Sequence, residues 1–268
     1  MIISDLDFIF ISYDEPKKEE FYKHNLSIIT NLKRVDGIKG IDAAHKQAAK
    51  ISNTDWFVVI DGDNIVNSTI LTASIDTNSY WKCFRYRSKN NINGVISGNG
   101  GISCWSKEFV LSMNTHESSN SESTKIEFGS QCKPTAGIYS VTYTDGSPYH
   151  AWRAGFREAV KLCLNTEIKQ NKKNLSLWHN IGRDVQNGFW SIYGARLGTY
   201  MTRFENLDLA IINDYDKLQN LWSEIIYSAN EDRCKELGIK IKESLDLDIV
   251  EYDSLGSQFF KKFLQNEL

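Results

Sequence analysis

The chain has 268 residues, of which 41% are hydrophobic, 24% charged and 12% aromatic, and its formal net charge is −3. A chain of this length and composition can bury a sizeable core without disulfides or a structural metal. The five cysteines are odd in number and show no zinc or redox spacing, which excludes a disulfide framework and indicates a reducing compartment. The opening residues are acidic where a signal peptide is basic, and no apolar run is long enough for a membrane span. We therefore expect a cytoplasmic protein with no membrane partner.

The charges are unevenly distributed along the chain. From residue 150 to 203 there are nine Lys and Arg against three Asp and Glu, a local excess of +6. From residue 204 to 268 there are seven against fourteen, a local deficit of −7. This distribution predicts a basic face for phosphates and a separate acidic, solvated face. The alternative is that the charges are scattered over the surface.

The first 65 residues predict a β-α-β-α-β unit, the pattern of a parallel sheet wound with helices. Apolar runs rich in β-formers predict strands over 6–12, 32–35 and 56–60, and helical spacing predicts helices over 17–29 and 42–51. Asp42 is a candidate N-cap of the second helix. Ligands of such sheets bind beyond the carboxyl ends of the strands, where two polar clusters, at 13–15 and 61–63, fall.

The rest of the chain is less regular. Alternating patterns predict strands over 81–87 and 137–144, and the Asn- and Gly-rich segment 90–101 predicts turns or a binding loop. Segment 114–124 reads as an exposed polar loop, and 151–164 as an amphipathic helix. A further helix is expected around Leu218, Leu221 and Ile225. The last helix, 254–265, is expected to bury its apolar residues, which are Leu255, Phe259, Phe260 and Phe263.

Asp61-Gly62-Asp63 directly follows the apolar strand 56–60. Two carboxylates two residues apart can approach one divalent cation, and hard cations such as Mg²⁺ or Mn²⁺ take oxygen ligands. A cation at this place would stabilise the charge that develops on a departing nucleoside diphosphate. Gly62 would let the backbone approach a ligand closely. The alternative is an acidic surface turn.

This half of the chain resembles family-2-type glycosyltransferases of the GT-A fold. In that family an Ala-Arg-Asn triplet on a helix precedes a strand that ends in Asp-x-Asp; here Ala44-His45-Lys46 occupies the triplet, and Ala48 stands where a Gly is usual. The resemblance covers about the first 65 residues. It implies an α/β, GT-A-like fold with a Rossmann-type, mostly parallel sheet flanked by helices and a helical C-terminal part. It also implies a nucleotide-sugar donor, with UDP-sugars the first choice, and Mn²⁺ or Mg²⁺ as cofactor.

The resemblance extends to domains and acceptor. It implies a GT-A catalytic domain over 1–203, with a nucleotide-binding half (1–65) and an acceptor half (66–203), and a helical extension over 204–268 packed on it. The whole chain also resembles a group of phage-encoded proteins through the stretches ISYDEP, GIKGIDAAHKQAAK, VVIDGDN and HAWRAGFREAVKL. That group is associated with sugar transfer, including arabinosyl transfer onto hydroxymethylcytosine in phage DNA. DNA is therefore the expected acceptor and the host cytoplasm the expected location; the oligomeric state is open.

The resemblance also implies roles for individual residues. In GT-A folds the turn after the first strand meets the nucleobase and ribose, and a late His often completes the metal site. Arg153, Arg157 and Lys161 recur every four residues and predict a basic stripe for a phosphate, unless it is a solvated face. The expected metal ligands are Asp61, Asp63 and His150. The expected nucleotide-sugar contacts are Ser12, Tyr13, Asp14, Glu15, Lys39, His45, Asp61, Arg153 and Arg157.

An enzyme of this class that inverts the sugar needs a base to deprotonate the acceptor hydroxyl, and Asp145 and Asp184 are the candidates. Lys33 and Arg34, near the second strand, could meet the diphosphate or form a solvated turn. The rings of Trp178, His179, Trp190 and Tyr193 could stack on a base or sugar, although core packing explains most of them equally well.

Other activities remain open at this point. A haloacid-dehalogenase-type phosphatase would use Asp61 as nucleophile, but that family starts its chain with the motif and follows it with Gly-Asp-x-x-x-Asp, which is absent here. A sugar nucleotidyltransferase needs a Gly-rich loop after the first strand, and residues 12–16 contain no glycine. A non-catalytic domain that binds nucleic acid or carbohydrate is the alternative from another class.

Overall fold

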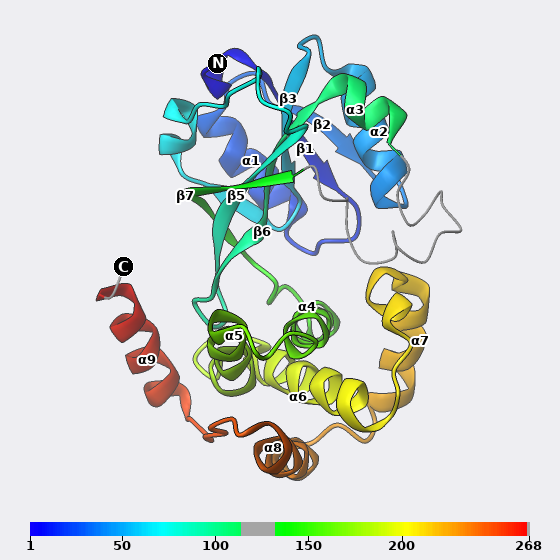
Figure 1. The fold of residues 1–268 in the computed structure, drawn as a ribbon, viewed down its shortest axis with the longest axis vertical. Helices are drawn as coiled ribbons and strands as arrows, with labels where there is room; N and C mark the ends of the chain where they lie inside the picture. Colours follow the sequence, from blue (N-terminus) through cyan, green and yellow to red (C-terminus); the bar gives the residue numbers. More distant parts are fainter. Residues whose placement is uncertain (114–131, 267–268) are drawn as a thin grey trace. The chain divides into compact units, whose positions relative to one another are not determined.

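The computed structural model describes residues 1–113 and 132–266 (Figure 1). The chain divides into two compact units. The first, called here the strand unit, comprises Met1–Asn90 and Ile96–Tyr143; the second, the helical unit, comprises Asn91–Val95 and Thr144–Leu268. The polar loop expected over 114–124 lies outside the described residues.

The strand unit opens with the predicted β-α-β-α-β order, and each element agrees with its predicted range to within one residue at each end. The elements are β1 Asp7–Ser12, α1 Lys18–Ile28, β2 Lys33–Asp36, α2 Ile41–Ile51 and β3 Trp56–Asp61. One detail of the prediction is wrong: Gly40 is the N-cap of α2, and its φ of 97° suits glycine. Asp42 lies inside the first turn and pairs with Lys46 at 3.0 Å, one turn further on.

The remaining elements of the strand unit complete a mixed sheet. They are η1 Ile3–Asp5, β4 Asn64–Val66, η2 Ser68–Thr72, β5 Cys83–Asn90, β6 Ile96–Ser106, α3 Lys107–Ser112 and β7 Cys132–Thr142. The strand order is β2-β1-β3-β6-β5-β7-β4. The pairs β1–β2, β1–β3 and β5–β7 are parallel, whereas β6 runs antiparallel to β3 and β5, and β4 runs antiparallel to β7. The fold class is α/β, with a sheet flanked by helices and a helical C-terminal part, as the sequence predicts.

The sequence predicts turns or a binding loop over 90–101, but only part of this segment is a turn. Residues 91–95 form the turn, and β6 begins at Ile96. Beyond its glycines the strand pairs on both sides, because residues 102–105 lie between β3 and β5, and Ile102 and Cys104 are buried there. The glycines themselves fall where the register with β5 shifts. This non-local pairing has no trace in the local composition.

Both faces of the sheet are covered, which explains the continuous apolar runs of β1 and β3. On one face Phe10 and Ile60 pack with Phe21 of α1. On the other face Phe57 and Val59 pack with Ala48 and its neighbour in α2. The two faces follow from the alternation of side chains along a strand.

The helical unit consists of helices with no strand among its described residues. They are α4 Pro148–Cys163, α5 Lys169–Asn180, α6 Gly188–Phe204, η4 Leu209–Asn213, α7 Tyr215–Ile225, α8 Glu231–Leu245 and α9 Ser254–Asn266. The helices α4 and α6 lie side by side (Figure 1) and approach closely at three glycines. A Cβ atom on Gly155 would lie 2.1 Å from the Ser191 carbonyl oxygen, and one on Gly194 would lie 2.2 Å from that of Trp152. Only glycine permits this contact of backbones.

The units divide at residues 143 and 144, whereas the sequence predicts a boundary at 203. The reason is the shared core of the helices. Trp152 and Phe156 of α4 belong to one buried cluster with Leu218 and Trp222 of α7 and Leu237 of α8. The segment 144–203 therefore packs with the C-terminal helices into one compact unit.

The last helix is present where it was expected, but its predicted burial is wrong. Leu255 and Phe259 are 74% and 73% exposed, whereas Phe260 packs on Tyr252. The side chain of Phe263 lies outside the described residues. No described helix combines the length and apolar character needed to cross a membrane.

Candidate functional site

The Asp-Gly-Asp turn lies at the carboxyl end of β3, as predicted. Asp61 is the last residue of β3, Gly62 and Asp63 form the turn, and Asn64 begins β4. Asp61 is exposed and Asp63 half-buried. The amide of Tyr143, next to the end of β7, donates to the Asp63 carbonyl at 2.7 Å. A backbone hydrogen bond thus fixes the turn, and its two aspartates lie at the carboxyl end of the interior strand β3.

Gly62 is needed because the turn packs against the end of β1. A Cβ atom at this position would lie 2.6 Å from Glu15 Oε2 and 2.8 Å from Ser12 Cβ. The sequence predicts that Gly62 makes room for a ligand, but the contact that the structure shows is with this neighbouring segment. Gly62 thereby brings the predicted donor-binding turn 12–15 against the predicted metal turn.

The turn after β1 is tied to β2 by charged groups. Ser12 Oγ and Lys18 Nζ both donate to Asp36 Oδ1 at 2.7 Å, and Lys18 also donates to the Tyr13 carbonyl at 2.7 Å. Burial raises the pKa of Asp36, but these bonds and the charges of Arg34 and Lys18 outweigh it, so its pKa lies below its usual value. Asp36 and Lys18 belong to this edge of the sheet, and the sequence reasoning missed both.

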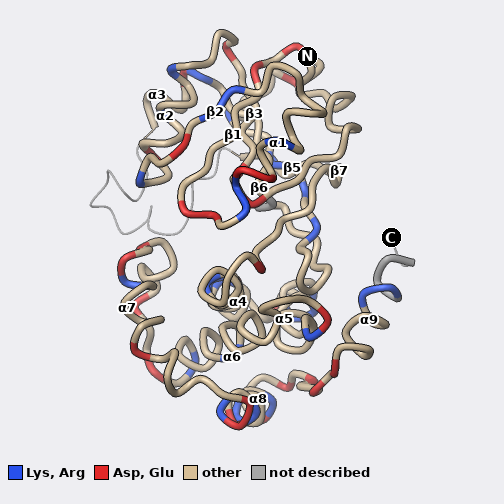
Figure 2. Tube along the Cα trace, turned by 180° about the vertical axis from the view of Figure 1, so that it is seen from behind, with Lys and Arg blue, Asp and Glu red and all other residues tan. Residues whose placement is uncertain are grey.

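The segment after β1 carries charges of both signs, Asp14-Glu15 and then Lys17-Lys18, which Figure 2 shows as red followed by blue. Tyr13 is exposed, and its amide donates to Glu15 Oε2 at 2.7 Å. Arg34 forms two hydrogen bonds with Glu19 and lies 4.9 Å from the centre of the Tyr22 ring. This network holds the turn in one conformation before any ligand arrives.

The other residues predicted at this edge differ in position: Lys39 follows the carboxyl end of β2, whereas His45 and Lys33 have other surroundings. His45 is buried in α2, where its Nδ1 lies 2.9 Å from the Ile41 carbonyl and its ring meets Trp105 edge-on at 5.5 Å. Lys33 begins β2 and binds Asp7 at 2.7 Å, at the amino end of the strands. Lys39 is exposed in the segment between β2 and α2. The nucleotide-sugar contact expected of His45 stays a prediction that its described contacts do not support.

The remaining predicted site residues belong to the helical unit. His150 lies in the first turn of α4, where its Nδ1 is 2.7 Å from the Ser147 hydroxyl, the N-cap of the helix. Arg153 stacks on Tyr149 and on Tyr215, with its guanidinium carbon 5.2 and 4.6 Å from the ring centres. Arg157 donates to the Ile212 carbonyl and to the Tyr215 hydroxyl, and Lys161 pairs with Glu158 at 2.6 Å. Much of the predicted basic stripe therefore fastens η4 and α7 to α4.

The two candidate bases differ in their surroundings. Asp184 forms an ion pair with Lys261 of α9 at 2.5 Å, and Lys261 also donates to the Ile92 carbonyl at 3.0 Å. The Asp145 carbonyl accepts from Asn187 Nδ2 at 2.8 Å. The Oδ1 atoms of Asp145 and Asp184 are both buried with no hydrogen-bond partner among the described residues. Asp184 therefore contributes to the attachment of the last helix.

The predicted basic middle and acidic tail do not form separate faces. They pair with each other, through Arg183 with Glu231 at 2.6 Å, Arg196 with Glu251 at 2.6 Å and Lys172 with Asp246 at 3.4 Å. Figure 2 shows both signs along α8. The helical unit as a whole has 16 Lys and Arg against 18 Asp and Glu, a net charge of −2.

Most of the four rings that were candidates for stacking on a base or sugar are instead packed in the hydrophobic core. His179 is fully buried, with its Nε2 2.9 Å from Thr199 Oγ1, and burial together with the charge of Arg196 lowers its pKa to about 3. Trp178 and Tyr193 are also buried, and Trp190 packs edge-on against Trp222 at 5.0 Å. The structure favours packing for this group.

The Asp-Gly-Asp turn fits a hard divalent cation by the chemistry of its donors. Mg²⁺ in particular is bound by one or two carboxylates together with water and substrate phosphates. Among the described residues no three His, Cys, Asp or Glu side chains gather into a closed metal cage. The turn therefore suits a cation that arrives with a phosphate-bearing ligand better than a structural metal.

Comparison with known proteins gives distant likenesses only. No family model and no curated protein matches the chain. Among solved structures, a glycosyltransferase involved in the glycosylation of the major capsid of PBCV-1 is 16% identical over 39% of this chain and 61% of its own, with a TM-score of 0.25. The matched region thus spans less than two thirds of that protein.

Two other solved structures match over more of their length. S. aureus TarS 1-349 is 10% identical over 98% of this chain and 92% of its own, with a TM-score of 0.37. The mannosyltransferase PcManGT from Pyrobaculum calidifontis, in complex with GDP-Man and Mn²⁺, is 12% identical over 90% and 81%, with a TM-score of 0.38. Values this low assign no activity. The site itself is that of an α/β protein in which the order β-α-β-α-β leads into an acidic turn.

Proposed function

We propose that the protein is a metal-dependent glycosyltransferase that uses a nucleotide-sugar donor. The observation that carries this proposal is the Asp61-Gly62-Asp63 turn at the carboxyl end of β3, packed against the turn that follows β1. Parallel sheets bind ligands at this edge. A phosphatase of the alternative family would need its nucleophile after the first strand, whereas Asp61 follows the third in the chain.

In this proposal Asp61 and Asp63 hold Mn²⁺ or Mg²⁺, which supplies positive charge for the departing diphosphate. The turn 12–15 contacts the nucleoside, and its links to Asp36 keep it ordered. A pre-ordered site loses less conformational entropy when the donor binds. We keep as hypotheses that His150 binds the metal and that Arg153 and Arg157 contact a phosphate. The affinity of single alanine variants for the nucleotide-sugar donor tests each of them.

Asp145 is the better of the two candidate bases. A base must accept a proton from the acceptor hydroxyl, so its carboxylate has to be available. Asp184 is engaged by Lys261 at 2.5 Å, and replacing it would also release α9. We therefore expect Asp145→Asn to reduce turnover with little effect on the unfolding midpoint, and Asp184→Asn to lower that midpoint.

For the acceptor we propose a hydroxyl of modified DNA, with hydroxymethylcytosine as the first substrate to test. The support is the resemblance of the whole chain to phage-encoded sugar transferases. The charge argument no longer adds to it, because the basic segment is paired within a helical unit of net charge −2. The hydroxymethyl group already projects into the major groove, so the base need not leave the duplex.

The test combines the protein, MnCl₂ and a panel of nucleotide-sugars with hydroxymethylated or plain DNA, followed by digestion and mass measurement of the nucleosides. A pentose or hexose added only to the hydroxymethylated base is the expected result. Transfer to a free sugar, lipid or protein with none to DNA would retain the glycosyltransferase and remove this acceptor. No transfer and no hydrolysis of any donor would contradict the proposed enzyme and favour a binding domain.

A further inference from the structure

A cluster of buried hydroxyl and amide groups lies directly behind the Asp-Gly-Asp turn in the strand unit. At its centre is Asn64, the residue after the turn, whose side chain is fully buried. Asn64 Oδ1 lies 3.0 Å from both Ser140 Oγ and Thr142 Oγ1, and Ser88 Oγ lies 2.7 Å from Thr142 Oγ1. Asn64 Nδ2 donates to Asp63 Oδ1 at 2.7 Å.

The number of protons that these groups can donate restricts which of them act as hydrogen-bond donors and which as acceptors. An amide oxygen offers two lone pairs, and each hydroxyl has one proton to donate. Ser140 and Thr142 can both donate to Asn64 Oδ1. Ser88 Oγ lies 2.7 Å from Thr142 Oγ1, 3.1 Å from the Ser140 carbonyl and 3.3 Å from Asn64 Oδ1, so its one proton also has an acceptor. The reversed amide would place its oxygen against the Asp63 carboxylate, so that two acceptors would face each other at 2.7 Å. The Asp63 carboxylate, which can only accept, therefore selects the orientation with the Asn64 N–H toward it, and the hydroxyls of Ser140 and Thr142 hold the amide oxygen on the other side.

The backbone on either side of Asn64 is held by a second asparagine. Asn25 of α1 is fully buried; it donates from Nδ2 to the Asn64 carbonyl at 2.8 Å and accepts from the Val66 amide at 3.0 Å. It bonds to this segment of β4 in the way a neighbouring strand would, while β4 pairs with β7 on its other side. Helix, strand and turn are thereby joined at one residue.

Gly101 of β6 provides the space for the Asn64 amide. Its φ is +73°, a conformation that L side chains rarely adopt. A Cβ atom at this position would lie 2.0 Å from Asn64 Nδ2. The glycine explains how a full amide fits into this interior and why its orientation is restricted.

We propose that Asn64 is a positioning residue for the metal turn, held in place by Ser88, Ser140 and Thr142. It donates to one carboxylate oxygen of Asp63, which fixes the rotation of that carboxylate. Partners of this kind, which orient a metal ligand without touching the metal, typically change metal affinity or activity by about 10- to 100-fold. This inference rests on the proposed function, because it assumes that Asp63 is a metal ligand.

The test uses the double variant Ser140→Ala/Thr142→Val, which removes the two hydroxyls and nearly preserves the side-chain volumes. Its Mn²⁺ affinity, measured by the electron paramagnetic resonance signal of free Mn²⁺ with and without UDP, should fall by roughly 10-fold or more. The Mn²⁺ concentration for half-maximal donor turnover should rise by a similar factor, and kcat should largely recover at saturating Mn²⁺. The single variant Thr142→Ser, which keeps the hydroxyl, should retain the wild-type Mn²⁺ affinity.

The matched control lies in the segment between α2 and β3, at the amino end of β1 and β3. Ser52→Ala/Thr54→Val removes the same two kinds of hydroxyl from the cluster around Asp7. It should lower the unfolding midpoint and leave Mn²⁺ affinity unchanged, which separates positioning from general stability. If the double variant at 140 and 142 does not fold, Thr142→Val alone serves as the test.

The outcomes distinguish this inference from the proposed function. In one outcome the wild-type protein binds Mn²⁺ and the folded Ser140→Ala/Thr142→Val variant binds it equally well. That outcome would overturn the role of Asn64 and leave the proposed metal turn in place. An equal loss of affinity in the Ser52→Ala/Thr54→Val control would also overturn it. Wild-type protein that binds no Mn²⁺, with or without UDP, would overturn the proposed metal site itself and this inference with it.

Discussion

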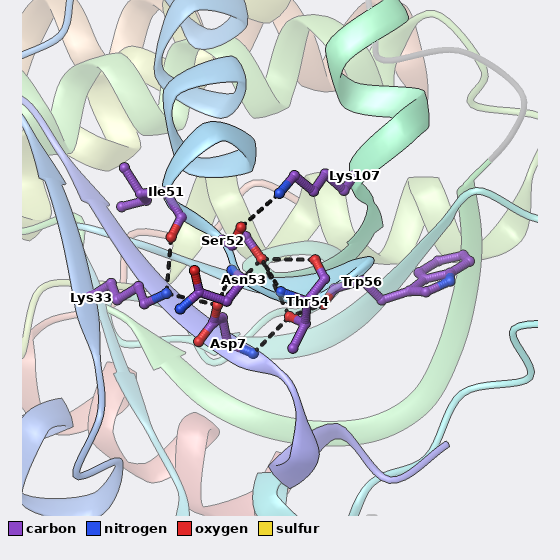
Figure 3. A network of polar contacts seen from close by, with 8 residues as sticks. All are labelled: Asp7, Lys33, Ile51, Ser52, Asn53, Thr54, Trp56 and Lys107. Carbon is purple, nitrogen blue, oxygen red and sulfur yellow. Dashed lines mark hydrogen bonds and ion pairs between the residues drawn. The ribbon is translucent and has the colours of Figure 1, made fainter.

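The two ends of the paired strands β1 and β3 use aspartate in opposite ways. At the amino end, Asp7 accepts hydrogen bonds from Lys33 Nζ at 2.7 Å and from the Asn53 amide (Figure 3). Burial raises the pKa of Asp7, but these bonds and the Lys33 charge outweigh it, and its pKa lies below its usual value. The rest of this cluster is formed by Ile51, Ser52, Thr54, Trp56 and Lys107.

At the carboxyl end, the aspartates lie on a turn whose support comes from behind. Asp61 is exposed and Asp63 half-buried, and the Asn64 amide and the Tyr143 backbone hold the turn from the interior. The amino end binds its acid with a lysine of the same sheet, so that end is closed and structural. An aspartate at a strand end therefore does not by itself identify a metal site. The groups that form hydrogen bonds and ion pairs with the carboxylate distinguish a structural aspartate from a candidate ligand.

The largest expected effect is loss of turnover at the carboxyl end. Asp61→Asn and Asp63→Asn should each reduce kcat/KM by roughly 100-fold or more, because a metal ligand contributes several kcal/mol to stabilising developing charge. The unfolding midpoint should stay near that of the wild type. Steady-state kinetics at saturating Mn²⁺ and thermal unfolding measure the two quantities.

The wild-type enzyme supplies the matching control by metal removal. EDTA should abolish its turnover, and added Mn²⁺ or Mg²⁺ should restore it. Full activity of either asparagine variant, or EDTA-resistant activity, would contradict the metal turn.

The opposite change is expected at the amino end. Asp7→Asn should lower the free energy of unfolding by about 1–3 kcal/mol, because it leaves Lys33 without its acidic partner. The activity of the folded fraction should be unchanged. Urea denaturation followed by circular dichroism checks the first value, and kinetics below the transition checks the second. A large loss of turnover in folded Asp7→Asn would erase the distinction between the two ends.

A third test concerns the close contact of the two turns. Gly62→Ala should cost about 1–3 kcal/mol of stability and reduce turnover, because its new Cβ would meet Ser12 Cβ at 2.8 Å. Gly98→Ala is the matched control, since among the described residues its Cβ would meet only Pro134 Cβ, at 4.0 Å. Equal behaviour of the two variants in thermal unfolding and kinetics would show that the packing of the turn is unimportant.

The smallest expected effect is the pH dependence of stability. The folded-state pKa of Asp7 lies below its unfolded value, so its contribution is present above the unfolded pKa and is lost as pH falls through the folded one. Wild-type protein should therefore lose stability between roughly pH 5 and pH 3. Asp7→Asn should lose less over that interval, and unfolding midpoints measured at intervals across it would detect the difference. Identical slopes would argue against the Asp7–Lys33 pair.

The first half of the fold could be predicted because its signals are local. Apolar runs such as 56–60 predict buried strands, and their ends were placed to within one residue. The Asp-Gly-Asp turn followed from the same pattern, since it directly succeeds such a run. By contrast β6 was missed, because its stability comes from pairing with β3 and β5 rather than from its own glycine-rich composition.

The helical unit was predicted less well. The helices α5, α6 and α8 were not predicted, and α6 is apolar or small on almost every face because α4 and α8 enclose it. The charge pattern of the unit was interpreted as two faces, although Arg183 and Arg196 pair with acids nearly 50 or more residues away. Sequence distance carries no information about such pairs.

The sequence by itself determined the α/β class, the β-α-β-α-β start and the position of Asp61 and Asp63 at a strand end. These depend on periodicity and on the order of neighbouring residues, which a single chain displays directly. Only the tertiary structure decided which aspartates are paired internally, and which hydroxyls stand behind the turn. Ser88, Ser140 and Thr142 come from two strands that meet Asn64 through sheet pairing, and hydrogen bonds between such distant segments exist only once the chain has folded.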